Sequence, residues 1–121
     1  MVPMTSDSPL SRPSEGPWSA GDLEVRIERL VDRLRTLAVP RLVRVDPESG
    51  CSIAEQVHGI ATAWARIVHG SGGPVPPVLG AEASGDLLAV LGREVVQAWD
   101  ALTADQREQV EQDVVALRRA T

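Results

Sequence analysis

Residues 52–69 read SIAEQVHGIATAWARIVH, and this stretch decides the fold. Ser52 and Glu55 match a capping box, in which the serine side chain accepts an early backbone N–H and the glutamate reaches back to the cap. Apolar side chains then recur every three or four residues, which predicts a helix over 53–69 with one buried stripe. Gly70 follows, and we expect it to end the helix with a positive φ. Because the stretch carries only two formal charges, we expect this helix to be the central element.

The same periodicity recurs three more times. It predicts further helices over 22–38, 85–102 and 104–120. We expect Pro40 to stop the first of these helices, Ser84 to cap the next, and Thr103 to open the last through a second capping box. The very short connection before Thr103 implies that the last two helices are antiparallel neighbours. The sequence therefore predicts an all-α four-helix bundle as one domain over residues 21–121.

The segments between and before the helices are rich in turn residues. Residues 1–20 hold four prolines and five serines, which favours a disordered tail, with Trp18 docking on the domain at its end. Residues 42–45 fit either a short extended segment or a single helical turn. The residues at 46–50 form a turn, and those at 70–78 form a Gly/Pro linker.

The length and the net charge of the chain limit the classes of function that it can have. The 121 residues suffice for one domain, and 17 acids against 12 arginines give a net charge of −5. Such a chain is a poor nucleic-acid binder, although six of the arginines lie between residues 26 and 44, which keeps a DNA-binding regulator as a third hypothesis. No apolar run reaches the ~20 residues of a membrane span, and the start shows no signal-peptide core. We therefore expect a cytoplasmic protein without a membrane partner.

The potential metal ligands are few and far apart. His58 and His69 share one helix face but lie about 16 Å apart along the axis, so they cannot bind one ion. We interpret their face as solvated, with a ligand or pH-sensitive contact as the alternative. Cys51 excludes an internal disulfide and, without a base in reach, is interpreted as a structural residue. We expect no cofactor and no metal.

Two tryptophans lie on the predicted inner stripes. Trp64 and Trp99 are the largest side chains of a core otherwise built from valine, alanine and leucine. Packing is the simpler interpretation. If the bundle holds a ligand pocket, Trp64, Trp99 and His58 are the residues expected to line it.

Two stretches resemble a known family. Residues 50–60 (GCSIAEQVHGI) resemble the start of the second helix in DinB-like bundles, which include mycothiol-dependent maleylpyruvate isomerases, and residues 87–106 resemble the third helix and its following turn. The resemblance implies a four-helix bundle. The family's metal-binding histidine aligns with Gly59, and no later His-x-x-x-His pair exists. The resemblance therefore carries over no three-histidine metal site.

These observations favour a small, non-enzymatic helical protein that binds another protein or forms a homo-oligomer. A core without Phe or Tyr is thin for about 100 ordered residues, and small residues flank the helix at 53–69, so we expect a two-fold homodimer. The alternative is a small-molecule-binding bundle, or a degenerate DinB-like enzyme, with a pocket near Trp64 and Trp99.

Overall fold

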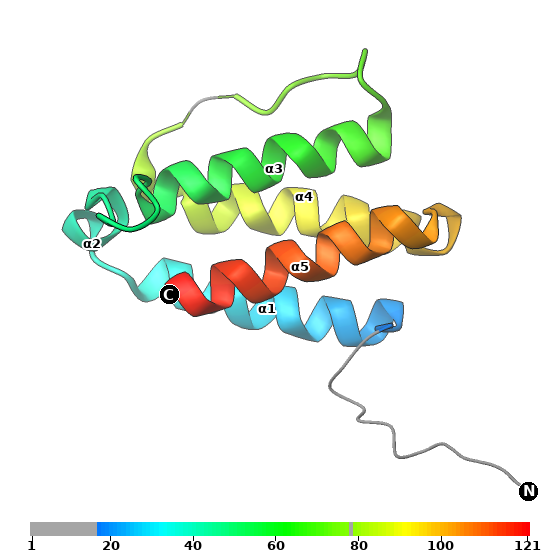
Figure 1. Cartoon of the computed structure of the whole chain (residues 1–121), viewed down its shortest axis with the longest axis horizontal. Helices are drawn as coiled ribbons and strands as arrows, with labels where there is room; N and C mark the ends of the chain where they lie inside the picture. Colours follow the sequence, from blue (N-terminus) through cyan, green and yellow to red (C-terminus); the bar gives the residue numbers. More distant parts are fainter. Residues whose placement is uncertain (1–16, 78) are drawn as a thin grey trace, which may run out of the picture.

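The computed structural model describes residues 17–77 and 79–121, and this part of the chain is an all-α bundle (Figure 1). The long helices are α1 (Ala20–Thr36), α3 (Ile53–His69), α4 (Ser84–Ala98) and α5 (Ala104–Ala120). The short elements are α2 (Val39–Val43) and the 3₁₀ turns Ala81–Ala83 and Trp99–Ala101. The predicted all-α four-helix bundle is confirmed. Within the described residues, no helix is long and apolar enough to cross a membrane.

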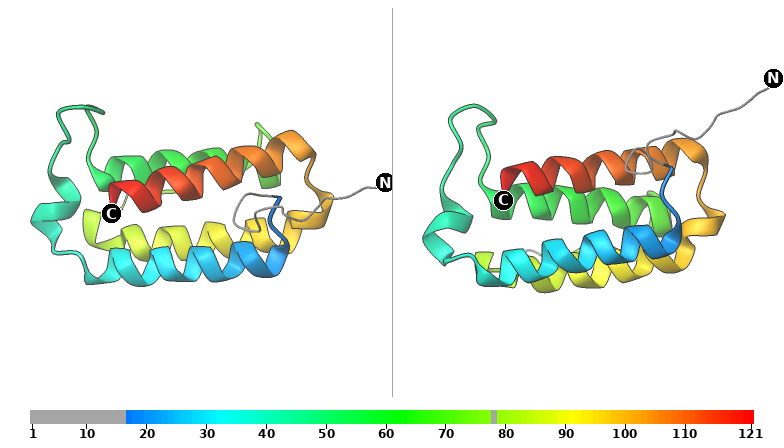
Figure 2. Two further views of the ribbon diagram at one scale, coloured as in Figure 1. Left: turned by 60° about the horizontal axis from the view of Figure 1, so that its bottom comes forward. Right: turned by 90° about the horizontal axis from the view of Figure 1, so that it is seen from below.

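The four long helices run side by side (Figure 2), and their contacts place each of them at one corner of the bundle. Helix α1 packs most extensively against α4 and also against α5, and α3 packs against the same two neighbours. The helices α1 and α3 therefore lie on a diagonal. Each corner helix turns one face inward, and the outer face of α1 is exposed, as Val25 at 45% exposure shows.

Side-chain caps set where the helices begin. The Ser52 Oγ accepts the Glu55 backbone N–H (3.1 Å), and the Glu55 carboxylate accepts the Ser52 backbone N–H (2.8 Å). Thr103 forms the second predicted capping box. A third one, between Ser19 and Asp22, was not predicted and starts α1 two residues earlier than expected. Each box satisfies two backbone donors that a helix N-terminus otherwise leaves free.

The ends of α4 differ from the prediction. The prediction that Ser84 caps this helix is wrong. The preceding 3₁₀ turn continues directly into α4, so Ser84 already has a helical conformation. Its hydroxyl donates back to the Ala81 carbonyl oxygen (2.7 Å) instead of accepting an N–H. The helix also stops at Ala98 rather than at residue 102, since Trp99–Ala101 tighten into a 3₁₀ turn.

The segment after α1 shows which of the two expected conformations residues 42–45 adopt. The helix ends at Thr36, so Pro40 does not stop it; Pro40 lies in the first turn of α2, where its missing N–H costs no hydrogen bond. Leu42 is buried within this helical turn, and the chain then becomes extended at Arg44. The predicted turn at 46–50 is confirmed by positive φ at Gly50.

The linker after α3 folds back along that helix and reaches the start of α4 (Figure 1). Gly70 has the predicted positive φ of 82°, although its ψ of 166° is extended rather than left-handed helical. Pro76 is buried, and Leu79 lies beside α3 near His58. Part of the weakly charged surface of α3 is therefore covered by the chain's own linker.

Trp18 docks as predicted and is only 6% exposed. Its backbone N–H donates to the Glu111 carboxylate of α5 (2.9 Å), and its carbonyl oxygen accepts the indole N–H of Trp99 (3.0 Å). These contacts hold the segment before α1 against the bundle. The tail predicted for residues 1–20 otherwise lies outside the described residues, since only 17–20 are described.

Candidate interaction surface

The two tryptophans proposed as pocket residues are core residues in the structure. Trp64 is 0% exposed and Trp99 is 2% exposed. The Trp64 indole N–H donates to the Asp113 carboxylate of α5 (3.0 Å), and the Trp99 indole N–H donates to the Trp18 carbonyl oxygen. Both rings thus satisfy their single polar atom inside the fold, and neither lines the hollows described below.

Among the titratable groups of the described residues, Asp113 is the one with a clearly shifted pKa. It is half-buried beside Trp64, and burial raises the pKa of its carboxyl because the charged form is disfavoured away from water. Hydrogen bonds from Gln109 (3.0 Å) and Trp64 lower the pKa, but they do not outweigh burial. The carboxylate acts as an acceptor for a core indole, and its pKa shift arises from burial and from hydrogen bonds with two uncharged side chains.

The prediction of a solvated face is wrong for His58. The linker covers this side chain, which is half-buried, and its Nε2 is buried without a hydrogen-bond partner. Leu79 and Ser84 line the small hollow beside it, of about 30 Å³. Neither Trp64 nor Trp99 lines this hollow, so the three candidate ligand residues do not share one site.

His69 and Cys51 are both exposed. The His69 Nε2 lies 2.6 Å from the Glu94 carboxylate of α4, an ion pair when the imidazole is protonated. Cys51 is a free thiol beside a hollow of about 330 Å³ that Arg41 and Arg44 also line. Across residues 17–77 and 79–121, no group of three or more His, Cys, Asp or Glu is placed to hold a metal ion.

The charges of α1 from Glu24 to Arg33 are sorted onto two flanks, a feature that sequence reasoning missed. Acids and arginines alternate along the chain, but at about 100° per residue they fall roughly 110° to either side of the buried face. The acidic flank consists of Glu24, Glu28 and Asp32. The arginine flank consists of Arg26, Arg29 and Arg33. The signal was present in the spacings i, i+4, i+8 and i, i+3, i+7, which each select one side of a helix.

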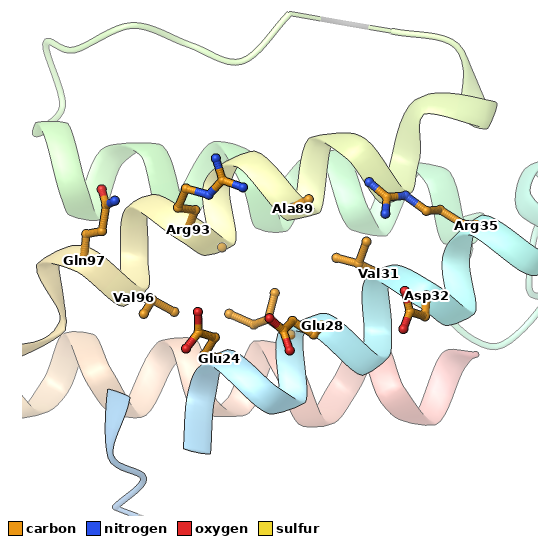
Figure 3. Close-up of a pocket in the computed structure, with 11 residues that line it drawn as sticks. Glu24, Glu28, Val31, Asp32, Arg35, Ala89, Arg93, Val96 and Gln97 are labelled. Carbon is orange, nitrogen blue, oxygen red and sulfur yellow. The ribbon is translucent and has the colours of Figure 1, made fainter. Parts of the chain in front are cut away.

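The acidic flank forms one rim of a groove between α1 and α4, here the α1/α4 groove, of about 600 Å³ (Figure 3). Arg93 and Gln97 of α4 stand on its other rim. The two helices approach closely because Gly92 has no side chain: a Cβ there would lie 2.6 Å from the Cγ2 of Ile27. At the end of the groove Arg35 pairs with Asp86 (2.8 Å), although both side chains are largely exposed.

The arginine flank forms one rim of a second groove, here the α1/α5 groove, of about 240 Å³. Its floor is apolar and comes from Leu30 and Val114, with Trp18 closing one end. Arg118 of α5 supplies a fourth guanidinium. The Arg26 guanidinium lies over the Trp18 ring, 4.3 Å from its centroid, in a cation–π contact.

The arginines of the α1/α5 groove have no acidic partner in the described part of the chain. The ion pairs there are Arg35–Asp86 and His69–Glu94. None of the four groove guanidiniums therefore has a carboxylate within 4 Å. In a chain with a net charge of −5, this groove concentrates positive charge at one place on the surface.

Comparison with protein-family models, curated proteins and solved structures finds nothing that matches this chain. The similarity of residues 50–60 and 87–106 to DinB-like bundles stays a prediction.

Proposed function

We propose that this protein is a non-enzymatic interaction module that binds another protein chain through α1 and the grooves beside it. The observation that carries the proposal is the sorting of α1 into an acidic and an arginine flank, each bordering a groove with an apolar floor. Complementary charge around an apolar contact area gives a protein interface its register and its association rate.

The position of α1 supports this role. As a corner helix it leaves its outer side open, and Val25, which is 45% exposed, lies there between the two charged flanks. These charged side chains take no part in core packing, because both flanks lie to the sides of the buried face of the helix. The small-molecule alternative placed a pocket beside Trp64 and Trp99, and the burial of both rings gives that alternative no support.

Self-association is one form of the proposal. If two copies pack with parallel α1 helices about a two-fold axis, the acidic flank of each faces the arginine flank of the other. In this arrangement Glu24 and Glu28 stand opposite the Arg29 and Arg33 of the second copy. Exposed ion pairs contribute only about 0–1 kcal/mol each, so such a dimer needs additional apolar contact.

A photo-crosslinking amino acid placed at position 25 tests the interaction role. In cells that produce the protein, we expect this position to form an adduct with a protein chain, because it lies at the centre of the proposed surface. The matched control is position 90 on α4, where Val90 is 55% exposed. The adduct's mass tells a second copy from another protein. Equal adduct yields at both positions, or none at position 25, would contradict the proposal.

A further inference from the structure

The polar side chains that line the α1/α5 groove are all hydrogen-bond donors. They are the guanidiniums of Arg26, Arg29, Arg33 and Arg118 and the indole of Trp18. A guanidinium carries five N–H groups and no acceptor, and an indole N–H only donates. A ligand of this groove must therefore supply acceptor atoms, and its complement is an anion.

One of these donors has no hydrogen-bond partner among residues 17–77 and 79–121. Trp18 is more than nine-tenths buried, and its indole Nε1 makes no hydrogen bond. An unsatisfied buried donor costs free energy, so an acceptor that reaches it gains more than it would at the surface. Glu111 accepts the Trp18 backbone N–H through one carboxylate oxygen but makes no hydrogen bond to the indole Nε1.

The arrangement of the donors favours an extended ligand. Arg26, Arg29 and Arg33 follow the spacing i, i+3, i+7, which spreads them over about 10 Å of α1 at ~1.5 Å per residue. A single phosphate cannot engage such a row, whereas carboxylates repeated along a peptide can. The floor between the two rims is apolar, and Val115, 36% exposed, extends it on α5.

We infer that the α1/α5 groove binds an acidic amphipathic segment of a partner protein, an inference that rests on the interaction role proposed above. The segment places an apolar side chain on Leu30 and Val115 and aligns its carboxylates with the arginines. Arginine clusters recognise acidic motifs in this way. A nucleic acid is a poorer partner, because its phosphate backbone offers no apolar side chain for the floor of the groove.

The test uses the full chain and a synthetic helical peptide of Glu, Leu and Ala, about 14 residues long, with Glu at positions i, i+3 and i+7 and Leu between them. In an NMR titration we expect the Nε–Hε signals of the groove arginines and the Trp18 indole signal to shift, while that of Arg66 does not. The double variant Arg29→Glu/Arg33→Glu is expected to weaken binding by at least about tenfold.

A matched double variant controls for the change in net charge. Arg66→Glu/Arg119→Glu alters the net charge equally; both residues are exposed, and neither lines the α1/α4 or the α1/α5 groove. It is expected to change the peptide affinity by less than about threefold, from long-range charge alone. Circular dichroism establishes that both variants are folded before their affinities are compared.

Three results would overturn the inference. They are equal affinity for a peptide with Gln in place of Glu, equal loss in the two double variants, and tighter binding of phosphatidylserine vesicles or duplex DNA than of the peptide at the same salt concentration. If the peptide fails while position 25 still crosslinks to a protein, the partner chemistry is wrong and the interaction role stands.

Discussion

At the scale of single residues, Trp64 and Asp113 connect the middle of α3 to α5. The ring is fully buried, and its N–H donates to a carboxylate that burial makes harder to ionise. The pair thus combines the bulk of the core with one polar contact whose strength depends on protonation. Both properties lead to measurable consequences for stability.

Replacing Trp64 with alanine is expected to lower the free energy of unfolding by ~3–5 kcal/mol, because the change leaves a large cavity. Trp64→Phe keeps most of the ring but leaves Asp113 without its donor, for an expected loss of about 1–3 kcal/mol. Urea unfolding measures both. Val90→Ala at the surface should stay within about 0.5 kcal/mol. A loss below about 1 kcal/mol for Trp64→Ala would show that the ring does not support the core.

Asp113 predicts how stability depends on pH. Its folded-state pKa lies above the ordinary value of 3.8, so the folded protein binds this proton more readily than the unfolded chain does. The stability it contributes is complete at lower pH and is lost as the pH rises through the folded-state pKa. Asp113→Asn removes the titration and keeps an acceptor oxygen for Trp64.

Thermal unfolding between about pH 3 and pH 7 checks this sign. The stability of the natural protein minus that of Asp113→Asn should fall as the pH rises above 3.8 and then become constant. A difference that grows in favour of the natural protein would mean that hydrogen bonding outweighs burial at this carboxyl.

At the scale of elements, the contact between α1 and α4 depends on Gly92. A methyl group there would meet Ile27 at 2.6 Å, so Gly92→Ala forces the helices apart. We expect a loss of about 1–3 kcal/mol, even though alanine is the better helix former. Gly59→Ala on α3 is the matched control: its Cβ meets nothing within 4 Å, and the change should stabilise by about 0.5–1 kcal/mol. Similar effects of the two changes would contradict this account of the contact.

Features that depend on neighbouring residues in the sequence were predicted well, whereas features that depend on tertiary packing were not. The helices at 53–69 and 104–120 were predicted with their observed bounds, because capping boxes and apolar spacing are local in sequence. The cover over His58 was not predicted, since the linker that provides it gives no sign of the side on which it returns. The charge sorting of α1 was readable from spacing, but the helices bordering each flank depend on tertiary packing.

At the scale of the whole molecule, the acidic chain carries a local concentration of arginines that form no ion pair with the acids of residues 17–77 and 79–121. The helix that presents them stands at a corner of the bundle, with an acidic flank along one groove and an arginine flank along the other. The small residues on the flanks of α3 led us to expect a homodimer. The linker covers part of that helix, so α1 offers the more accessible surface for a partner.

Native mass spectrometry of the protein isolated gently from its own cells tests the central claim most directly. The account predicts a complex heavier than the 12.9 kDa chain, in which the excess mass is a second copy or another protein. It also predicts that Arg29→Glu/Arg33→Glu returns the folded chain to 12.9 kDa, while Arg66→Glu/Arg119→Glu leaves the complex in place. A mass of 12.9 kDa for the natural protein would contradict the account.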